Sequence, residues 1–548
     1  MKENRSPLYL LLFVLALVVN FSGVNLGFFT DDPGLYASIS KNLLSSKEFW
    51  ELFTYNQDWL DKPHLPFWAV MVSFKLFGIS IWAYRLPALL FFLLSLLYTW
   101  LFTKKHYGKE IAWIAILILA TAQHVVMSNT DVRAEPYLMA LVIGSIYHIS
   151  RLQERFTFAD IILAALLTAC AVMTKGIFVI VAIYGALLGQ LIFQGKLRQA
   201  FQWKWLLLFL LTGVFILPEI YALYIQFDLH PEKTVFHRHN VSGIQWFLWD
   251  SQFGRFVNKG AITRQSGDIF FYVHTLLWAF APWCLVFYYA VFENIKGILQ
   301  KRPLAEYYTL SGAVLLLVLF SLSRFQLPFY TNTIFPLFAV VTAPSCYNQL
   351  SRVGTWFRQI SFWVYTILLL LAILAVQYFS APGHIAYFIA DLIAFAGAAV
   401  LIVRQTGTPI KLFLLACAAS LFANFYLNTV FYKLVISYRG QIKAAGYVNQ
   451  PPFARYHLYS LRTENNVFQF YSKRPIDYVP LDSFKTFKPI EPSAFYVNKR
   501  SLDSLKILHA DFKVIKAFQN YPQENILPAF IDKKTRNTTL DSVYLVTK

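Results

Sequence analysis

Long apolar runs recur along the first 430 residues and predict a polytopic α-helical membrane protein. A helix needs roughly 20 predominantly apolar residues to cross a bilayer, and several of these runs are slightly shorter than that. We predict about thirteen transmembrane helices, at residues 7–27, 85–103, 110–127, 136–150, 158–174, 176–194, 204–225, 271–292, 306–323, 328–349, 360–379, 384–403 and 411–430. The first run is too long for a signal-peptide core and lacks a small-residue cleavage site, so we expect it to remain as an uncleaved helix.

Basic residues fall on alternate connections between these runs. With the N-terminus inside, the inside connections carry Lys2, Arg5, Lys104, Lys105, Lys109, Arg151, Arg155, Lys196, Arg198, Lys204, Lys296, Lys301, Arg302, Arg352, Arg358, Arg404 and Lys411. The short outside connections hold only Arg133, Lys175 and Arg324. The positive-inside rule therefore predicts a cytoplasmic N-terminus, and it leaves the three outward cations without a topological explanation.

Three larger segments lie outside in this topology, namely the loops 28–84 and 226–270 and the tail 431–548. The tail mixes proline and charge with short alternating runs such as Ala494-Phe-Tyr-Val-Asn498, which predict a small α/β domain. We therefore divide the chain into a transmembrane domain, 1–430, whose two outer loops carry the site, and an extracytoplasmic domain, 431–548. The tail's excess of basic residues suits an anionic membrane surface, although a solvated face explains it equally well.

Composition agrees with this topology and excludes several other classes of protein. The chain has 548 residues, of which 57% are hydrophobic and only 14% charged. An ordinary soluble domain is about 25% charged, so a disordered, nucleic-acid-binding or secreted disulfide-framework protein is excluded. The net charge of +19 follows largely from the positive-inside distribution, and no nucleic acid is needed to explain it. The four cysteines lie in apolar runs and indicate buried side chains rather than disulfides.

Two adjacent acids, Asp31 and Asp32, stand where the first outer loop begins. Asp32 followed by Pro33 predicts the start of a helix, with a capping carboxylate and then proline at the first helical position. The following apolar positions give one face, so we expect a short helix lying in the membrane interface. One cap needs one carboxylate, and two at the mouth of a transmembrane helix repel each other and lose hydration. We therefore favour a functional role for the pair over capping alone.

A further acid, Asp61, precedes Lys62 and Pro63 in the same loop and again precedes an expected interfacial helix. Asp61 could be a metal ligand, since hard cations take carboxylate oxygens, or it could form an exposed salt bridge and a cap. Lys62 lies on the outer face, where lysine is disfavoured, and could hold a phosphate as a point charge.

The remaining charged positions outside divide between structural and functional interpretations. Asp131, Arg133 and Glu135 crowd one short turn, where an internal ion-pair network is as well supported as contact with a substrate. His237 and His239 are a weak metal hint, and a solvated loop explains them better. Arg255 could reach a phosphate or lie in an aromatic stack. Lys175, Arg324, Arg133 and Lys62 at one membrane depth indicate a receptor for an anion on a lipid head group.

Several motifs taken in order resemble the C-type membrane glycosyltransferases that use polyprenyl-phosphate sugars. The nearest groups are the lipid A aminoarabinose transferases and the dolichyl-phosphate-mannose protein mannosyltransferases. The resembling motifs are Thr30-Asp-Asp32, Asp61-Lys-Pro63, Trp82-Ala-Tyr-Arg-Leu-Pro87, Asp131, Thr174-Lys-Gly176, Gln252-Phe-Gly-Arg-Phe256 and Arg324-Phe-Gln-Leu-Pro-Phe-Tyr330. The resemblance covers residues 1 to about 430, and the tail matches in position only.

The resemblance implies an inverting transfer on the outer face, with roles for particular residues. Asp31 would be the catalytic base, assisted by Asp32. The donor lipid phosphate would be held by Lys62, Arg255, Arg324 and Lys175. Tyr36, Asp131, Arg133, Glu135 and Tyr330 would line the substrate cavity. Asp61 occupies the place of a metal ligand, for a divalent ion such as Zn, Mg or Mn. The sequence departs from the family pattern at Gly34 and Gln326, where relatives often have a basic residue, and at Gln252, where one branch has a histidine ligand.

We therefore expect a glycosyltransferase with a polyprenyl-phosphate-linked sugar donor in a bacterial inner membrane, and with a periplasmic tail. Its acceptor would be a lipid such as lipid A or a protein Ser/Thr hydroxyl, and the residues do not decide between them. A transporter of lipid-linked substrates is the alternative, but transporters show paired halves with broken helices and midplane charges, whereas here the charges gather at one face. A non-catalytic scaffold that binds through the tail is a third, weaker alternative.

Overall fold

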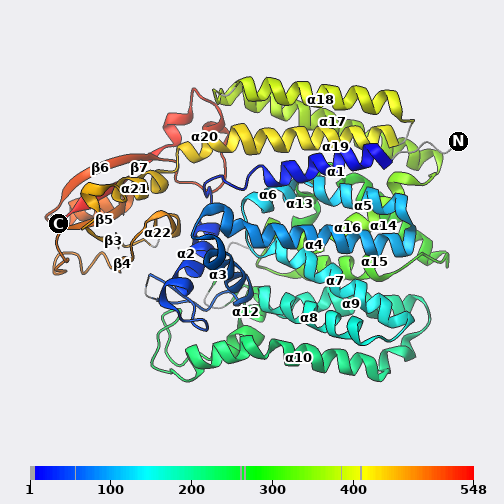
Figure 1. The fold of residues 1–548 in the computed structure, drawn as a ribbon, viewed down its shortest axis with the longest axis horizontal. Coiled ribbons are helices and arrows are strands. Elements are labelled where there is room, and N and C mark those ends of the chain that lie inside the picture. Colours follow the sequence, from blue (N-terminus) through cyan, green and yellow to red (C-terminus); the bar gives the residue numbers. More distant parts are fainter. Residues whose placement is uncertain are drawn as a thin grey trace.

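The computed structural model describes residues 6–55, 57–259, 262–263, 267–383, 385–407, 410–463 and 465–548. Lys2 and Arg5, which contribute to the positive-inside pattern, lie outside the described residues. The chain forms a bundle of long helices with a small sheet domain at one end (Figure 1). The N-terminus lies at the opposite end of the bundle from the sheet domain and the C-terminus (Figure 1).

Each of the thirteen predicted apolar runs contains helix. The helices of the bundle are α1 (Ser6–Phe21), α4 (Ile81–Tyr107), α5 (Lys109–Thr121), α6 (Gln123–Thr130), α7 (Glu135–Glu154), α8 (Phe158–Lys175), α9 (Val179–Phe193), α10 (Trp203–Leu223), α13 (Phe271–Ala279), α14 (Cys284–Leu299), α15 (Tyr308–Leu322), α16 (Phe335–Tyr347), α17 (Arg352–Ser380), α18 (Ile385–Gln405) and α19 (Ile410–Tyr426). Among the described residues, six helices are long and apolar enough to cross a membrane, and the pair α5 and α6, bent by 54°, would make a seventh. The predicted polytopic helical fold is thus confirmed, with several runs shorter than a full span.

Besides the run that forms α5 and α6, two further predicted runs differ from continuous helices. The run 271–292 is broken between α13 and α14, where Pro282 has no backbone N–H to continue a helix. The run 328–349 begins as a 3₁₀ helix, Pro328–Ile334, before α16. The four cysteines form no disulfide, as expected from their apolar surroundings.

The motif 82–87 has a structural role at the outer end of α4. Arg85 is fully buried and donates hydrogen bonds to the carbonyl oxygens of Thr130 at 2.7 Å and Leu26 at 2.5 Å. The hydroxyl of Tyr84 donates to the carbonyl of Val132 at 2.8 Å. A buried guanidinium must have partners, so these bonds hold the linker before the first acidic pair against the turn after α6.

The first outer loop contains α2 (Asp31–Ser46), the strands β1 (Phe53–Thr54) and β2 (Gln57–Asp58), and α3 (Leu65–Phe77), which include both predicted outer-loop helices. A π-helical turn, Tyr224–Asp228, leads into the second outer loop, which contains α11 (Gly243–Gln245) and α12 (Ser251–Val257) joined by a second π-helical turn, Trp246–Asp250. Buried His64 holds the first loop to α10 by bonding Glu219 at 2.9 Å, and Gln226 joins the second loop to the first by bonding the backbone of Leu52.

The tail is the predicted α/β domain. A π turn, Leu427–Phe431, leads from α19 into α20 (Tyr432–Ser437). The domain then contains α21 (Gly440–Val448), β3 (His457–Leu461), α22 (Asn466–Tyr471), β4 (Ile476–Val479), β5 (Ser493–Asn498), α23 (Lys499–Ile507), β6 (Lys513–Asn520), α24 (Pro528–Ile531) and β7 (Asp541–Thr547). Its sheet has the order β4-β3-β5-β7-β6, with β3 parallel to both β4 and β5, and β7 antiparallel to β5 and β6.

Helix α22 of the tail packs against α2 of the first outer loop. The hydroxyl of Ser38 donates to the carbonyl of Asn466 at 3.0 Å, and the ammonium of Lys41 donates to the carbonyl of Ser472 at 2.5 Å. A Cβ atom at Gly34 would lie only 2.9 Å from the backbone nitrogen of Val467. The departure from the family pattern at Gly34 therefore has a physical reason, since a larger side chain would separate the two helices.

Replacing Gly34 with alanine is expected to weaken this docking, because the close atom is backbone and cannot move aside cheaply. Overpacking of this kind costs about 1–3 kcal/mol. The matched control is Gly446→Ala in α21, where an added Cβ meets nothing within 4 Å. Thermal unfolding and hydrogen exchange at α2 and α22 measure the difference. Equal stability and equal exchange in the two variants would contradict the packing argument.

Candidate functional site

The acidic pair lies in the first turn of α2, although not in the predicted arrangement. The helix begins at Asp31, with Thr30 at the N-cap position, so Asp32 is not the capping carboxylate and Pro33 is not the first helical residue. Thr30 does not cap the helix with its side chain either, because its hydroxyl donates to Asp131 at 2.6 Å. Asp31 and Asp32 both lie in the first turn, at the positive end of the helix dipole.

A cavity of about 110 Å³, here called the polar cavity, lies beside this turn. Its lining comes from both outer loops, from the outer ends of α7 and α8, and from the segment between α15 and α16. The charged residues and tyrosines that line it are Asp32, Tyr36, Asp61, Lys62, Arg133, Glu135, Lys175, Arg255 and Tyr330. The structure therefore gathers most of the site residues expected from the sequence around one small space.

Every cation of the polar cavity is paired with a carboxylate. Lys62 and Arg255 both donate to Asp61, and Lys175 donates to Glu135. Arg133 donates to Asp32 at 2.6 Å and to Asp131 at 3.2 Å. Arg133 and Asp131 thus form the ion-pair network that was one expectation for this turn, and Arg133 and Glu135 also line the cavity.

These pairings shift the titration of the buried groups. Burial opposes the ionisation of Asp61, but the charges of Lys62 and Arg255 outweigh it and hold its pKa below the usual value. Burial and the nearby charge of Arg255 lower the pKa of Lys62. A dianionic ligand in the cavity would supply further negative charge beside Lys62 and Arg255, and electrostatics favours that arrangement strongly away from water.

Aromatic rings from the motif 324–330 lie against these cations. The ammonium of Lys175 is 4.1 Å from the ring centre of Tyr330, and the guanidinium of Arg133 is 4.4 Å from that of Phe329. Arg255 lies 5.8 Å from the ring centre of Phe325. Ring faces attract cations, so this segment stabilises the positive side of the cavity through its aromatic residues.

An apolar groove of about 300 Å³ adjoins the polar cavity. It is lined mainly by Ile177, Phe178, Val181, Phe253, Leu319 and Phe320. Lys175, Arg255, Phe325 and Tyr330 line both spaces. An amphiphile with an anionic head and a hydrocarbon tail fits this pair of spaces, with the head at the cations and the tail in the groove.

Arg324 is the one predicted phosphate-binding cation that the structure does not bring to the polar cavity. Its side chain is exposed, while its neighbour Phe325 lines the cavity. Its backbone N–H donates to the carbonyl of Phe256 at 2.9 Å, which joins this segment to α12. Asp131 also lies outside the lining and contributes through Arg133 and Thr30.

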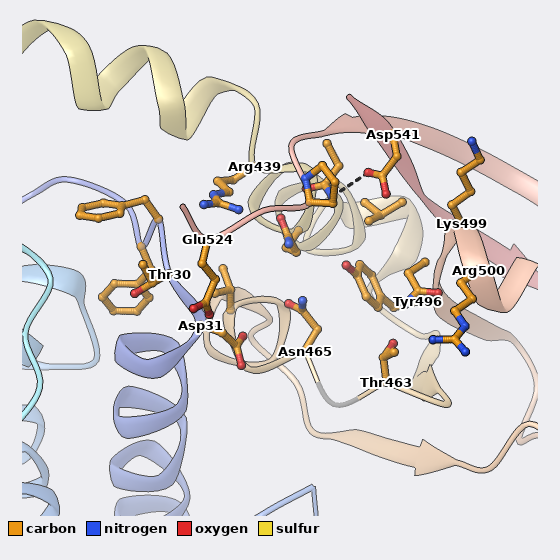
Figure 2. Close-up of a pocket in the computed structure, with 18 residues that line it drawn as sticks. Thr30, Asp31, Arg439, Thr463, Asn465, Tyr496, Lys499, Arg500, Glu524 and Asp541 are labelled. Carbon is orange, nitrogen blue, oxygen red and sulfur yellow. Dashed lines mark hydrogen bonds between the residues drawn. The ribbon is translucent and has the colours of Figure 1, made fainter. Parts of the chain in front are cut away.

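Asp31 faces a different space from Asp32. A cavity of about 320 Å³, here called the domain cavity, lies between the start of α2 and the tail domain and is defined by Thr30, Asp31, Arg439, Asn465, Lys499 and Arg500 (Figure 2). The first turn of α2 therefore stands between the two cavities, with one carboxylate on each side.

The carboxylate of Asp31 has an unusual environment for an acid. The side-chain amide of Asn466, on α22, donates to it at 2.7 Å. Burial, together with the negative charges of Asp32 and Glu524, raises its pKa to about 6, although the bond from Asn466 acts in the opposite direction. A carboxylate with a pKa close to neutral is suited to general-base catalysis, since it can be both ionised and basic.

The residues around Asp61 do not fit a metal site. Its carboxylate already accepts from Lys62 and Arg255, two cations that would repel a metal ion. Gln252 occupies the position at which one branch of the resembling family has a histidine ligand. Its side-chain amide donates to the hydroxyl of Ser251 at 2.7 Å. Within the described parts of the chain, no three His, Cys, Asp or Glu side chains gather as metal ligands do, and this includes the region of His237 and His239.

Several residues of these cavities were not predicted from the sequence. Asn466 and Arg439 lie in the tail, more than 400 positions from the acidic pair, and no periodicity or motif marks them. Trp59 and Phe329 line the polar cavity from within segments already singled out. Aromatic residues beside outward cations were the signal that could have identified these two.

Comparison with known proteins gives sequence likenesses over much of the chain. The family model described as dolichyl-phosphate-mannose-protein mannosyltransferase matches residues 61–221, which include Lys62, Arg133 and Lys175. An uncharacterized protein of Aquifex aeolicus is 24% identical over 386 residues, which are 68% of this chain and 70% of that protein. The undecaprenyl phosphate-alpha-4-amino-4-deoxy-L-arabinose arabinosyl transferase of Edwardsiella ictaluri is 25% identical over 342 residues, which are 61% of this chain and 57% of that protein.

Solved structures show the likeness in the fold. The crystal structure of ArnT from Cupriavidus metallidurans bound to undecaprenyl phosphate has a TM-score of 0.76 and 17% identity, and the match covers 98% of this chain and 97% of that one. The oligosaccharyltransferase of Archaeoglobus fulgidus has a TM-score of 0.51 at 12% identity, covering 92% of this chain and 69% of that one. The predicted fold and the predicted family resemblance are confirmed, including the small C-terminal sheet domain.

Proposed function

We propose that this chain, a membrane glycosyltransferase of the C type, transfers a sugar from a polyprenyl-phosphate carrier to an acceptor hydroxyl with inversion at the anomeric carbon. The observation that carries the proposal is the position of α2, whose first turn presents Asp32 to the polar cavity and Asp31 to the domain cavity. The related structure bound to undecaprenyl phosphate supports a donor of the same class. The comparisons favour a transferase over the transporter alternative.

In this mechanism the donor lies with its phosphate in the polar cavity and its tail in the apolar groove. Lys62, Lys175 and Arg255 hold the phosphate, and Arg133 keeps Asp32 in place beside it. Negative charge accumulates on the phosphate as the glycosidic bond breaks, and fixed cations in a site with little water stabilise that charge. No step is assigned to Zn, Mg or Mn, because the donor set at Asp61 does not fit a metal.

Asp31 acts as the general base. It takes the proton of the acceptor hydroxyl as the hydroxyl oxygen forms a bond to the anomeric carbon. The bond from that carbon to the phosphate oxygen breaks, and the electron pair leaves with the polyprenyl phosphate. Attack from the face opposite to the leaving group inverts the configuration. Asn466 positions the carboxylate through its hydrogen bond.

The same proposal places the protein in a bacterial inner membrane with a cytoplasmic N-terminus and a periplasmic tail. The basic residues at the ends of α4 and α7 lie on connections that the positive-inside rule assigns to the cytoplasm. The acceptor is either a lipid such as lipid A or a protein Ser/Thr hydroxyl. Mass spectrometry of surface lipids and of exported proteins, in cells with and without the gene, tests the function. Loss of one sugar from either fraction, restored by the wild-type gene, is expected, and unchanged fractions would contradict transfer.

Transfer is expected to depend on pH through Asp31. Because only the carboxylate form accepts a proton, activity should fall as the pH decreases through about 6. Replacing Asn466 with leucine removes a hydrogen bond that favours the ionised form, so the midpoint should move to higher pH. The measurement is kcat against pH in proteoliposomes.

The matched control for this shift is Asn42→Leu, which lies on α2, the helix that carries Asp31. The amide of Asn42 donates to the carbonyl of Phe53 at 3.0 Å and is not hydrogen-bonded to Asp31. This variant should keep the wild-type midpoint even if its rate changes. Identical midpoints in the wild type and both variants would contradict the assignment of Asp31.

A further inference from the structure

Glu219, near the outer end of α10, is a buried carboxylate that the proposed mechanism does not use. Its side chain is 0% exposed. Carboxylates inside membrane helices are rare and costly, and they usually have a function. Both of its oxygens face one residue, His64, which directly follows the motif Asp61-Lys-Pro63 of the first outer loop. Glu219 therefore connects a spanning helix to the segment that carries a cation of the polar cavity.

Three hydrogen bonds fix His64 between α10 and the first outer loop. Its backbone N–H donates to Oε2 of Glu219 at 3.0 Å, and its Nδ1 lies 2.9 Å from Oε1 of the same carboxylate. Its Nε2 lies 3.0 Å from the carbonyl oxygen of Trp50. Because a carbonyl oxygen can only accept, Nε2 must carry the hydrogen of that bond. His64 is thus held at its backbone and at both ring nitrogens.

This anchor constrains Lys62, which lies only two positions before His64. Residues 59–64, which the structure describes throughout, form neither helix nor strand, so no regular backbone pattern fixes them. Pro63 joins the two residues with a nearly fixed φ angle. Fixing the backbone of His64 therefore limits where the ammonium of Lys62 can lie.

Glu219 is not placed to touch the donor itself. With Asp61, Lys62 and Lys175 it lines a void of only about 10 Å³, which is at the lower limit for a single water molecule. Both of its carboxylate oxygens are already engaged by His64. Any effect of Glu219 on the donor must therefore act through the segment that it holds.

We propose that Glu219 is a positioning residue for the donor phosphate: through His64 it fixes the segment 61–64, so that the ammonium of Lys62 stays at the polar cavity. This inference rests on the proposed function for the role of Lys62. A site that is ordered before its ligand arrives avoids the entropy cost of ordering Lys62 on binding. Removing a group that orients a ligating side chain typically costs about 10- to 100-fold in affinity or activity.

The test is the binding of undecaprenyl phosphate by the full chain in lipid nanodiscs, with thermal unfolding measured on the same samples. Glu219→Leu removes both acceptors and should weaken binding about 10- to 100-fold. Glu219→Gln should restore binding, because the amide can keep all three bonds. Its Oε1 can accept the backbone N–H of His64, its Nε2 can donate to Nδ1, and the ring can still donate from Nε2 to Trp50.

Two further variants separate positioning from stability. H64F/E219L replaces both buried polar side chains with apolar ones, so it should be more stable than Glu219→Leu and yet bind as weakly. The matched control is Asp160→Leu, which breaks another buried histidine–carboxylate pair, with Nδ1 of His148 at 2.7 Å, at the opposite end of α8 from Lys175. It should lose stability but bind as the wild type does.

Three results would overturn the inference and leave the proposed function standing. These are equal binding by the wild type and Glu219→Leu, an equal loss in Glu219→Leu and Glu219→Gln, and an equal loss in Glu219→Leu and Asp160→Leu. A wild-type chain that does not bind undecaprenyl phosphate would overturn both the inference and the proposed donor.

Discussion

Asp31→Asn is expected to lower kcat for sugar transfer about 10²–10⁴-fold, which is the usual contribution of a positioned general base. The amide has almost the shape of the carboxylate and can still bond to Asn466, but it cannot accept the acceptor's proton. The polar cavity contains no atom of Asp31 in its lining, so donor binding should stay close to that of the wild type. Single-turnover transfer from a polyprenyl-phosphate sugar in proteoliposomes measures the chemical step separately from binding.

The neighbouring carboxylate provides the comparison that makes this result specific. Asp32→Asn removes the charged partner of Arg133 inside the polar cavity, so it should alter donor binding as well as rate. A rate loss confined to kcat in Asp31→Asn, with a mixed effect in Asp32→Asn, would support the assignment of the base. Full transfer by Asp31→Asn would show that another group takes the proton.

Lys62→Met should have the second largest effect, a loss of about 10²–10³ in kcat, comparable with the removal of one preorganised stabilising group. Methionine keeps much of the side chain's volume but removes the charge that we propose faces the leaving phosphate. Lys62 is also a partner of Asp61, so the variant leaves that carboxylate with Arg255 alone. Unfolding measurements must therefore accompany the kinetics, because breaking a buried pair destabilises a protein.

Two further variants separate the role of Lys62 in binding phosphate from its role in folding. The double variant D61N/K62M has the wild-type net charge but leaves the buried Arg255 without its carboxylate, so it is expected to unfold at a lower temperature than Lys62→Met and to remain impaired in transfer. Lys75→Met, at an exposed position on α3 in the same outer loop, should leave both stability and rate unchanged. Recovery of full transfer in the double variant would mean that Lys62 serves only to balance Asp61.

The helical part of the fold could be predicted because a bilayer imposes one strong pattern, a long apolar run for each helix. The α/β tail followed from alternation and turn signals, and α2 and α3 followed from proline positions and apolar spacing. The breaks in the bundle were missed where local backbone chemistry overrides hydropathy, as at Pro282 between α13 and α14. The start of α2 was placed two residues late, because Thr30 rather than Asp32 occupies the N-cap position.

The candidate site was predictable only in part, for a physical reason. Lys62 and Lys175 drew attention because the positive-inside rule disfavours cations outside, and the structure places both in one cavity. The same rule singled out Arg324, whose side chain is exposed, because hydropathy does not report the direction of a side chain in a non-helical segment. Asn466 bonds Asp31, and Arg439 lines the same cavity as Asp31, only because the tail domain docks on α2. The local sequence carries no signal for this contact between domains.

The central claim is that the polar cavity and the apolar groove together hold a polyprenyl phosphate beside the first turn of α2. A cryo-electron microscopy structure of the full chain in lipid nanodiscs with added undecaprenyl phosphate tests it most directly. The account predicts phosphate density within hydrogen-bond distance of Lys62, Lys175 and Arg255, with the hydrocarbon chain along Phe178 and Phe320. Phosphate bound at Lys499 and Arg500 instead, or a chain that leaves the bundle elsewhere, would contradict it.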